Sequence, residues 1–262
     1  MSTTTAGADS ATGSATTGAG LGLRGAALGR RGEGGAVLDG VGLDVVPGEI
    51  LAVVGPSGCG KSTLLRTLAG LLPPLSGEVT QDGEPVRGPG AERALVFQED
   101  ALLPWRTVRR NVELPLAVRG VARAARRSTA DAWLERTGLA GHGGKYPHQL
   151  SGGQRQRVQL ARALAGEPRA VLMDEPFGAL DARTRAGMQR LLVEVLHGTG
   201  ATVVFVTHDV DEALFLGDRV ALLGGGTLLD VLGVPRPRDR QARTDPRTLA
   251  LRRTVLASLD TD

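Results

Sequence analysis

The sequence predicts an α/β fold with a mostly parallel sheet. Short apolar runs rich in β-branched residues alternate with helical patterns, and each run is too short for a helix and is bounded by turn or polar residues. The predicted strands cover residues 50–54, 95–97, 171–173, 202–206 and 220–223. Strands that alternate with helices are typical of a doubly wound parallel sheet.

Helix stop signals define three of the connecting helices. The first follows Lys61 and ends at Gly70, the second covers residues 123–137 before Gly138, and the third starts at Ser151 and ends near Gly166. The region of about residues 99–165 has several helical signals and no convincing strand. We therefore expect a helical subdomain inserted into the order of the sheet.

Composition limits the class of protein. The chain has 262 residues, of which 41% are hydrophobic and 23% are charged, as is ordinary for a globular protein with a sizeable core. No stretch approaches the roughly 20 apolar residues needed to span a bilayer, and no secretory signal is recognisable. The net charge of +3 gives no basic stripe for nucleic acid. The single cysteine, Cys59, fits a reducing cytosolic compartment.

Composition also suggests three regions along the chain. Residues 1–20 are rich in Ser, Thr, Ala and Gly and cannot bury enough apolar surface to offset chain entropy, which predicts a disordered leader. Residues 21–233 are expected to form one nucleotide-binding domain, because no internal repeat is visible. Residues 234–262 begin with Pro and Arg and continue as a mixed-charge segment with some helical pattern. We expect this tail to be peripheral.

A phosphate-binding loop lies between the first strand and the first helix. The segment matches G-x-x-x-x-G-K-[ST], whose glycines let backbone N–H groups approach a phosphate while the helix N-terminus adds partial positive charge. Lys61 would contact the β and γ phosphates, and the Ser62 hydroxyl would bind Mg²⁺. A glycine-rich turn with a chance lysine is the alternative. The loop residues are Gly55, Pro56, Ser57, Gly58, Cys59, Gly60, Lys61, Ser62 and, one residue further, Thr63.

Two carboxylates end the predicted strand near residue 173. Asp174 is expected to hold Mg²⁺, commonly through water, and Glu175 to polarise the attacking water. The alternative is a solvated turn after a strand, since Asp-Glu-Pro is common there. The phosphate loop favours the functional interpretation, because a Mg²⁺-bound triphosphate needs two carboxylates with different tasks.

A second candidate anion site starts at Ser151. Ser151 and Gln154 form an S-x-x-Q capping-box pattern, and Gly152 and Gly153 would leave the helix N–H groups open. As a capping signal alone, the pattern favours an ordinary capped helix. However, residues 150–154 read Leu-Ser-Gly-Gly-Gln, and here the chain resembles the ABC transporter ATPase family, whose signature sequence is LSGGQ.

The resemblance covers about residues 36–225 and implies a P-loop NTPase core of the ABC ATPase type. That core has a mostly parallel sheet, an antiparallel β subdomain and an inserted helical subdomain. Gln98 matches the Q-loop glutamine that binds Mg²⁺, Asp181 lies in the D-loop segment 179–181, and His208 matches the histidine that contacts the γ-phosphate. The resemblance further implies a head-to-tail homodimer that sandwiches ATP between the phosphate loop of one subunit and Ser151 of the other.

The likeness fails at the adenine contact. The family commonly has an aromatic residue before the first apolar segment, whereas residues 28–33 contain none, and Arg31 is the nearest substitute by spacing. A guanidinium can stack on a base. Simple loss of the contact is the other possibility.

Details of the sequence resemble the branch of importers for nitrate, sulfonate and taurine. They are residues 96–105, Asn111 with Val112, and residues 175–181. The resemblance implies membrane permease subunits, an extracytoplasmic substrate-binding protein and a peripheral position on the cytoplasmic face of the cell membrane. We expect part of the Leu-Leu-Pro-Trp segment at 102–105 to dock on the permease, with core packing as the alternative.

Three other assignments compete with this one. Importers of thiamine-precursor pyrimidines and of bicarbonate have similar ATPase sequences. A non-transport ABC ATPase is disfavoured, because the chain has neither a second phosphate loop nor the long heptad pattern of a coiled coil. An unrelated phosphate-loop kinase is disfavoured by the signature segment and by the Asp174-Glu175 pair.

Overall fold

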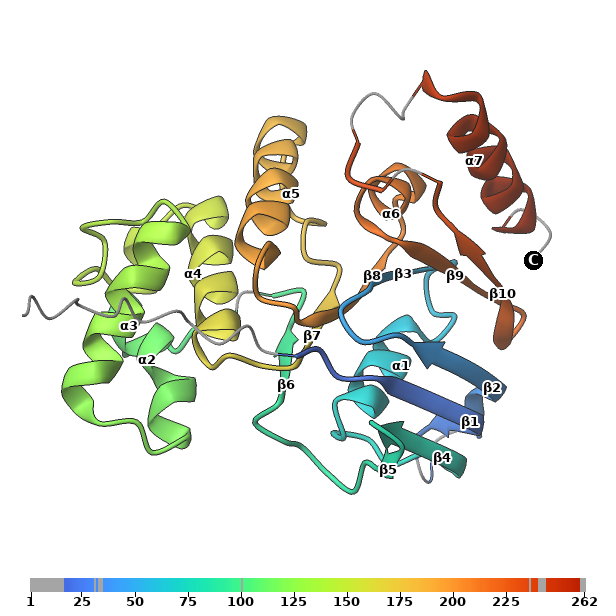
Figure 1. Cartoon of the computed structure of the whole chain (residues 1–262), viewed down its shortest axis with the longest axis horizontal. Coiled ribbons are helices and arrows are strands. Elements are labelled where there is room, and N and C mark those ends of the chain that lie inside the picture. Colours follow the sequence, from blue (N-terminus) through green and yellow to red (C-terminus); the bar gives the residue numbers. More distant parts are fainter. Residues whose placement is uncertain are drawn as a thin grey trace, which may run out of the picture.

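Two sheets organise the chain, as the computed structural model in Figure 1 shows. The structure describes residues 17–30, 32, 35–99, 101–235, 237–239 and 244–259. The larger sheet has the strand order β10-β9-β3-β8-β7-β6. Its strands are β3 (Ile50–Val54), β6 (Arg93–Val96), β7 (Ala170–Asp174), β8 (Thr202–Thr207), β9 (Arg219–Gly224) and β10 (Thr227–Gly233).

All neighbours in this sheet pair in parallel except β9 and β10. The predicted mostly parallel α/β architecture is therefore confirmed. Continuous apolar runs form β3, β7 and β8 because these strands are buried on both faces. Gly225 and Gly226 form the tight turn between β9 and β10. Their φ angles of 52° and 74° suit such a turn.

The smaller sheet is antiparallel and has the order β2-β1-β4-β5. Its strands are β1 (Leu21–Gly29), β2 (Ala36–Val45), β4 (Ser76–Gln81) and β5 (Glu84–Pro85). Helix α1 (Lys61–Leu68) contacts strands of both sheets. Leu64, Leu65 and Leu68 are fully buried in a core that also contains Leu23 of β1 and Val53 of β3. This packing fixes the start of α1 at the end of β3.

Three helices form the inserted subdomain at one end of the molecule (Figure 1). They are α2 (Val108–Val118), α3 (Arg123–Arg136) and α4 (Gly152–Ala165), with the short 3₁₀ helix η1 (Pro147–Gln149) before α4. Asn111 is fully buried and ties α2 to the preceding loop: its Nδ2 donates to the carbonyls of Leu103, Arg106 and Thr107, and its Oδ1 accepts from the N–H of Leu103.

The remaining helices follow strands of the large sheet. They are α5 (Ala182–Leu196), α6 (Val210–Leu216) and α7 (Pro246–Leu259). No helix in the described part of the chain is both long and apolar enough to cross a bilayer. The predicted peripheral tail forms α7, which packs on α6 at the edge of the molecule opposite the helical subdomain (Figure 1).

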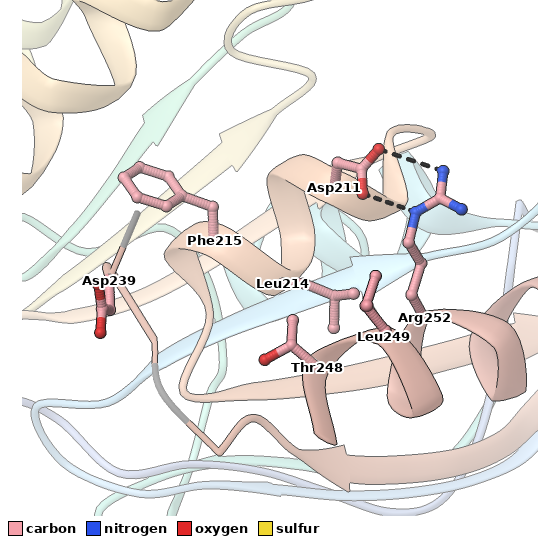
Figure 2. Close-up of a pocket in the computed structure, with 7 residues that line it drawn as sticks. All are labelled: Asp211, Leu214, Phe215, Asp239, Thr248, Leu249 and Arg252. Atoms are coloured by element: carbon pink, nitrogen blue, oxygen red, sulfur yellow. Dashed lines mark hydrogen bonds and ion pairs between the residues drawn. The ribbon is translucent and has the colours of Figure 1, made fainter. Parts of the chain in front are cut away.

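Helix α7 is held mainly by apolar burial. Val255 is fully buried in the main core. Figure 2 shows Arg252 of α7 reaching Asp211 of α6, with Nε 2.7 Å from Oδ1 and Nη2 3.3 Å from Oδ2. Both side chains of this ion pair are about half exposed, so solvent screens it and it contributes little to stability.

The first described residues lie against β8. Residues 1–16 of the predicted leader lie outside the described residues, whereas residues 17–20 are described and make contacts with the domain. Thr202 is fully buried, and its Oγ1 donates to the carbonyl of Ala19 (2.6 Å) and accepts from the N–H of Gly48 (2.9 Å). The N–H of Ala19 donates to the carbonyl of Arg169. One hydroxyl thus connects three distant segments.

We predict that Thr202→Val lowers the free energy of unfolding by about 1–3 kcal/mol, because it leaves a buried carbonyl and a partly buried N–H without a partner. Denaturant titration of the purified protein measures this change. The matched control is Thr227→Val, whose hydroxyl donates to the carbonyl of Asp39 at an exposed position. Equal losses in the two variants would contradict the role assigned to Thr202.

Candidate active site

Polar side chains from four separate segments converge at the carboxyl edge of the large sheet. The adjacent parallel strands β3, β8, β7 and β6 end side by side. Lys61 and Ser62 follow β3, Gln98 follows β6, Asp174 ends β7, and His208 follows β8. Ligands of open α/β sheets bind outside the carboxyl ends of the strands. The residues predicted to bind the triphosphate and Mg²⁺ therefore lie together at this edge of the sheet.

The phosphate loop depends on two close approaches of the backbone. A Cβ on Gly55 would lie 2.5 Å from the carbonyl oxygen of Leu223, and a Cβ on Gly60 would lie 2.7 Å from the side chain of Leu38. Gly60 also has a φ of 103°, which L residues with side chains rarely adopt. Only glycine fits both positions, so the loop is tightly constrained by β9 and β2.

The Lys61 side chain connects two backbone carbonyls of the phosphate loop. Its side chain is only 7% exposed, and its Nζ donates to the carbonyl oxygens of Gly55 (2.8 Å) and Pro56 (2.7 Å). No carboxylate of the described residues forms an ion pair with it. The ammonium group is thus held across the loop by neutral acceptors, where it can turn to a phosphate.

Ser62 and Asp174 form the centre of the site. The Ser62 Oγ donates to Asp174 Oδ1 at 2.9 Å, which joins α1 to the end of β7. Asp174 is buried, and this burial raises the pKa of its carboxyl group above the ordinary value, against the opposing effect of the Ser62 hydrogen bond. Ser62 and Asp174 thus place a hydroxyl oxygen and a carboxylate oxygen at the end of β7. Oxygens of this kind are the ligands that Mg²⁺ prefers.

Glu175 lies between two neighbouring segments. Its Oε2 accepts from Gln98 Nε2 at 3.2 Å and lies 3.5 Å from His208 Nδ1. The residue has a φ of 43°, an uncommon conformation for a residue with a side chain and one that is often associated with functional sites. The structure therefore brings together three residues that the sequence suggested separately.

Gln159 positions the Gln98 segment and was missed by the sequence reasoning. It is buried in α4, and its Nε2 donates to the carbonyls of Phe97 (2.9 Å) and Glu99 (3.1 Å), on either side of Gln98. Its only sequence signal is a polar residue on the buried face of a helix.

The predicted second half-site lies apart from the first. Ser151 Oγ accepts from the N–H of Gln154, and Gln154 Oε1 accepts from the N–H of Ser151, which completes the capping box at the start of α4. A Cβ on Gly153 would lie 2.9 Å from Thr184 Cγ2, so this helix start packs against the beginning of α5.

Asp181 caps α5 next to this helix start. Its Oδ1 accepts from the N–H groups of Arg183 and Thr184, and hydrogen bonds from Thr184 lower the pKa of its carboxyl group. No hydrogen bond or ion pair among the described residues joins Ser151–Gln154 or Asp181 to the phosphate loop.

One further expectation concerns Arg31, and one further residue near the site was not expected. Arg31, the suggested substitute for the adenine-stacking aromatic residue, lies outside the described residues. Glu212, which the sequence analysis did not single out, lies behind the site: it is buried, and its Oε1 accepts from Gln189 Nε2 at 3.0 Å. The D-x-x-E pattern of Asp209 and Glu212 is a capping signal that marks the start of α6.

Burial raises the pKa of Glu212, while hydrogen bonds from Thr207 and Gln189 and the charge of Arg185 oppose this rise and Asp209 reinforces it. A raised pKa in the folded state means that stability is lost as pH rises through that pKa. We therefore predict that Glu212→Gln, which keeps the acceptor for Gln189, gains stability relative to the wild type as pH rises from the acid range to neutral. Denaturant titrations across pH test this. The exposed Glu194→Gln is the matched control, and the same trend in both variants would contradict the role of burial at Glu212.

Comparison with known proteins identifies the family. The family model for the ABC transporter matches residues 38–178. The taurine import ATP-binding protein TauB of Chromobacterium violaceum is 50% identical over 237 residues, which cover 87% of this chain and 91% of that protein. An uncharacterized ABC transporter ATP-binding protein of Methanocaldococcus jannaschii is 49% identical over 207 residues, or 78% of each chain.

Solved structures agree with these matches. A dimeric ATP-binding cassette in a post-hydrolysis state, bound to ADP and Pi, superposes with a TM-score of 0.73 and 34% identity and covers 82% of this chain and 99% of that chain. A second dimeric structure of a bacterial ABC transporter cassette has the same TM-score and 35% identity. The chain therefore belongs to the ABC transporter family, as an ATP-hydrolysing member.

Proposed function

We propose that this chain is the energy-coupling ATPase subunit of an importer for taurine or a closely related sulfonate. The observation that carries the substrate class is the 50% identity to a taurine import ATP-binding protein across most of both chains. A taurine import ATP-binding protein of Yersinia pestis, 45% identical over 236 residues, supports the same class. The ATPase subunit has no contact with the transported molecule, so the substrate has to be tested by transport.

In this proposal the phosphate loop and Lys61 bind the triphosphate of ATP. The Lys61 ammonium exchanges its bonds to the loop carbonyls for the β and γ phosphates. Ser62, Gln98 and Asp174 would hold Mg²⁺, which neutralises developing charge on the phosphates. Their hydroxyl, amide and carboxylate oxygens suit this hard cation. The described residues contain no cluster of three or more His, Cys, Asp or Glu, so nucleotide and water would complete the coordination.

Glu175 is the proposed general base. It takes a proton from the attacking water as the oxygen of that water bonds to the γ-phosphorus, and the bond to the β–γ bridging oxygen breaks to release ADP and phosphate. His208, 3.5 Å from Glu175, would donate to the γ-phosphate. Gln98 would orient the water and the cation, because it already donates to Glu175.

Two copies of the chain complete each nucleotide site in this proposal. Ser151, Gly152, Gly153, Gln154 and Asp181 lie apart from the phosphate loop of their own subunit. A head-to-tail homodimer would bring the open α4 N-terminus of one subunit to the γ-phosphate held by the other. The dimeric ABC cassettes among the solved structures support this arrangement.

The proposed partners are membrane permease subunits, with an extracytoplasmic binding protein supplying the substrate to them. The chain would work at the cytoplasmic face of the membrane. In the segment expected to dock, Leu102 is buried whereas Pro104 and Trp105 are exposed, Trp105 by 72%. Exposed aromatic residues are common anchors of interfaces. Core packing therefore accounts for the start of the segment, and docking for its end.

We predict that Glu175→Gln binds ATP and forms a stable dimer but hydrolyses ATP about 10²–10⁴-fold more slowly than the wild type, because the general base is lost while the binding groups remain. Light scattering with and without ATP measures the dimer, and phosphate release measures turnover. The exposed Glu135→Gln on α3 is the matched control. Hydrolysis by the Glu175 variant at the wild-type rate would refute the assignment.

We predict that cells lacking this chain lose uptake of labelled taurine, and that the wild-type gene restores it. The Lys61→Ala variant should not restore uptake, because triphosphate binding needs the ammonium group. Parallel assays with nitrate, bicarbonate and a thiamine-precursor pyrimidine test the other importer classes. Restored uptake of one of these and not of taurine would show that the proposed substrate class is wrong.

A further inference from the structure

The His208 side chain has few contacts of its own. It is 60% exposed, and its Nδ1 lies 3.5 Å from Glu175 Oε2. No hydrogen bond with another described residue fixes the imidazole ring. His208 stands between Thr207, the last residue of β8, and Asp209, the residue before α6. The position of the imidazole therefore depends on how its two neighbours are held.

Glu212 is hydrogen-bonded to both of these neighbours. The Thr207 hydroxyl donates to the Glu212 carboxyl group and accepts from the N–H of Asp209 at 3.0 Å. The N–H of Glu212 in turn donates to Asp209 Oδ1 at 3.1 Å. Glu212 thus connects the residue before His208 with the residue after it, through its side chain on one side and its backbone on the other.

Helix α5 supports these bonds from a second direction. Gln189 Nε2 donates to Glu212 Oε1 at 3.0 Å, and Arg185 Nη1 lies 3.6 Å from Asp209 Oδ2. Arg185 and Gln189 are four residues apart in sequence, so they lie on the same face of α5. Glu212 and Gln189 are buried, and a hydrogen bond in a buried environment is stronger than one in water. The segment that carries His208 is therefore tied to α5 as well as to α6.

A carboxyl group at the position of Glu212 is unfavourable for packing alone. Burial raises the pKa of Glu212, because the charged form is costly to remove from water. Replacing buried charged groups by well-packed apolar residues often leaves stability unchanged or raises it. The fold alone therefore does not account for this carboxyl group, whereas its hydrogen bonds have a clear use if they order a part of the active site.

We propose that Glu212 is a positioning residue for ATP hydrolysis, which fixes residues 207–209 so that the His208 imidazole faces the γ-phosphate. This inference rests on the proposed function, because it requires the contact between His208 and the γ-phosphate. Glu212 acts on the reaction only through Thr207 and Asp209. Without its hydrogen bonds, the segment samples other conformations, and His208 is correctly placed for a smaller fraction of the time.

Two substitutions break this connection in different ways. Glu212→Ala removes the carboxyl group. Thr207→Val removes the hydroxyl that joins Glu212 to Asp209 but nearly keeps the shape of the side chain, so it tests the proposal even if Glu212→Ala folds poorly. Thr207→Ser returns the hydroxyl. The matched control is Glu194→Ala, at an exposed position on α5. Circular dichroism and denaturant titration check the fold of each variant.

We expect Glu212→Ala and Thr207→Val to lower kcat about 10–100-fold, because a displacement of about 1 Å at a catalytic group can cost about a hundredfold in rate. KM for ATP should change by less than about threefold, because Lys61 and the phosphate loop are unaltered. Thr207→Ser should recover most of the lost rate, and Glu194→Ala should resemble the wild type. Steady-state measurement of phosphate release gives both constants.

Combination with His208→Ala separates positioning from a purely structural role. If Glu212 acts through His208, the double variant with Glu212→Ala and His208→Ala should hydrolyse ATP within about twofold of the rate of His208→Ala alone, since residues that act as a unit are not additive. A further loss in the double variant as large as the loss caused by Glu212→Ala in the wild-type background would overturn the proposal.

The behaviour of His208→Ala distinguishes a failure of this inference from a failure of the proposed function. If His208→Ala is slow but Glu212→Ala and Thr207→Val hydrolyse ATP at the wild-type rate, His208 keeps its proposed role and the positioning role of Glu212 is wrong. If His208→Ala itself keeps the wild-type rate, the proposed contact of His208 with the γ-phosphate is wrong, and so is the inference that depends on it.

Discussion

Parallel pairing of β3, β8, β7 and β6 is the constraint on which the site depends. Val54 is level with Thr207, Asp174 with Val206, and Val96 with Met173. Groups more than a hundred residues apart in sequence therefore leave the sheet at one edge. A slip of one residue in any pair would turn the side chains to the other face. The register of these strands thus determines which polar side chains meet at the site.

A single helix connects the two halves of the proposed nucleotide machinery. Helix α4 begins with the signature residues, and Gln159 on the same helix holds the backbone on both sides of Gln98. Ser151 and Gln159 are about two helical turns apart. Movement of the helical subdomain therefore carries the start of α4 and the Gln98 segment together. In the proposed dimer, this packing would link the contact between subunits to the arrangement around Glu175.

The sequence predicted those parts of the structure whose signals are local. Continuous apolar runs identified the parallel strands, and glycine and lysine spacing identified the phosphate loop. Strands β1 and β2 gave no clear signal, because β1 is rich in glycine and alanine and its pairing with β2 contains register shifts. Pro115 interrupts the helical sequence pattern of α2, although the helix itself continues through it. The tasks of Gln159 and Glu212 depend on contacts between distant segments, which spacing along the chain does not encode.

The two bonds from Lys61 to the loop carbonyls have a thermodynamic consequence for phosphate binding. They hold the carbonyls of Gly55 and Pro56 in place, and the close contacts at Gly55 and Gly60 constrain the loop further. Binding then replaces one set of partners of the ammonium group by another and does not have to order a flexible segment. Preorganisation of this kind lowers the entropic cost of association. A loop constrained in this way therefore loses little conformational entropy when a triphosphate binds.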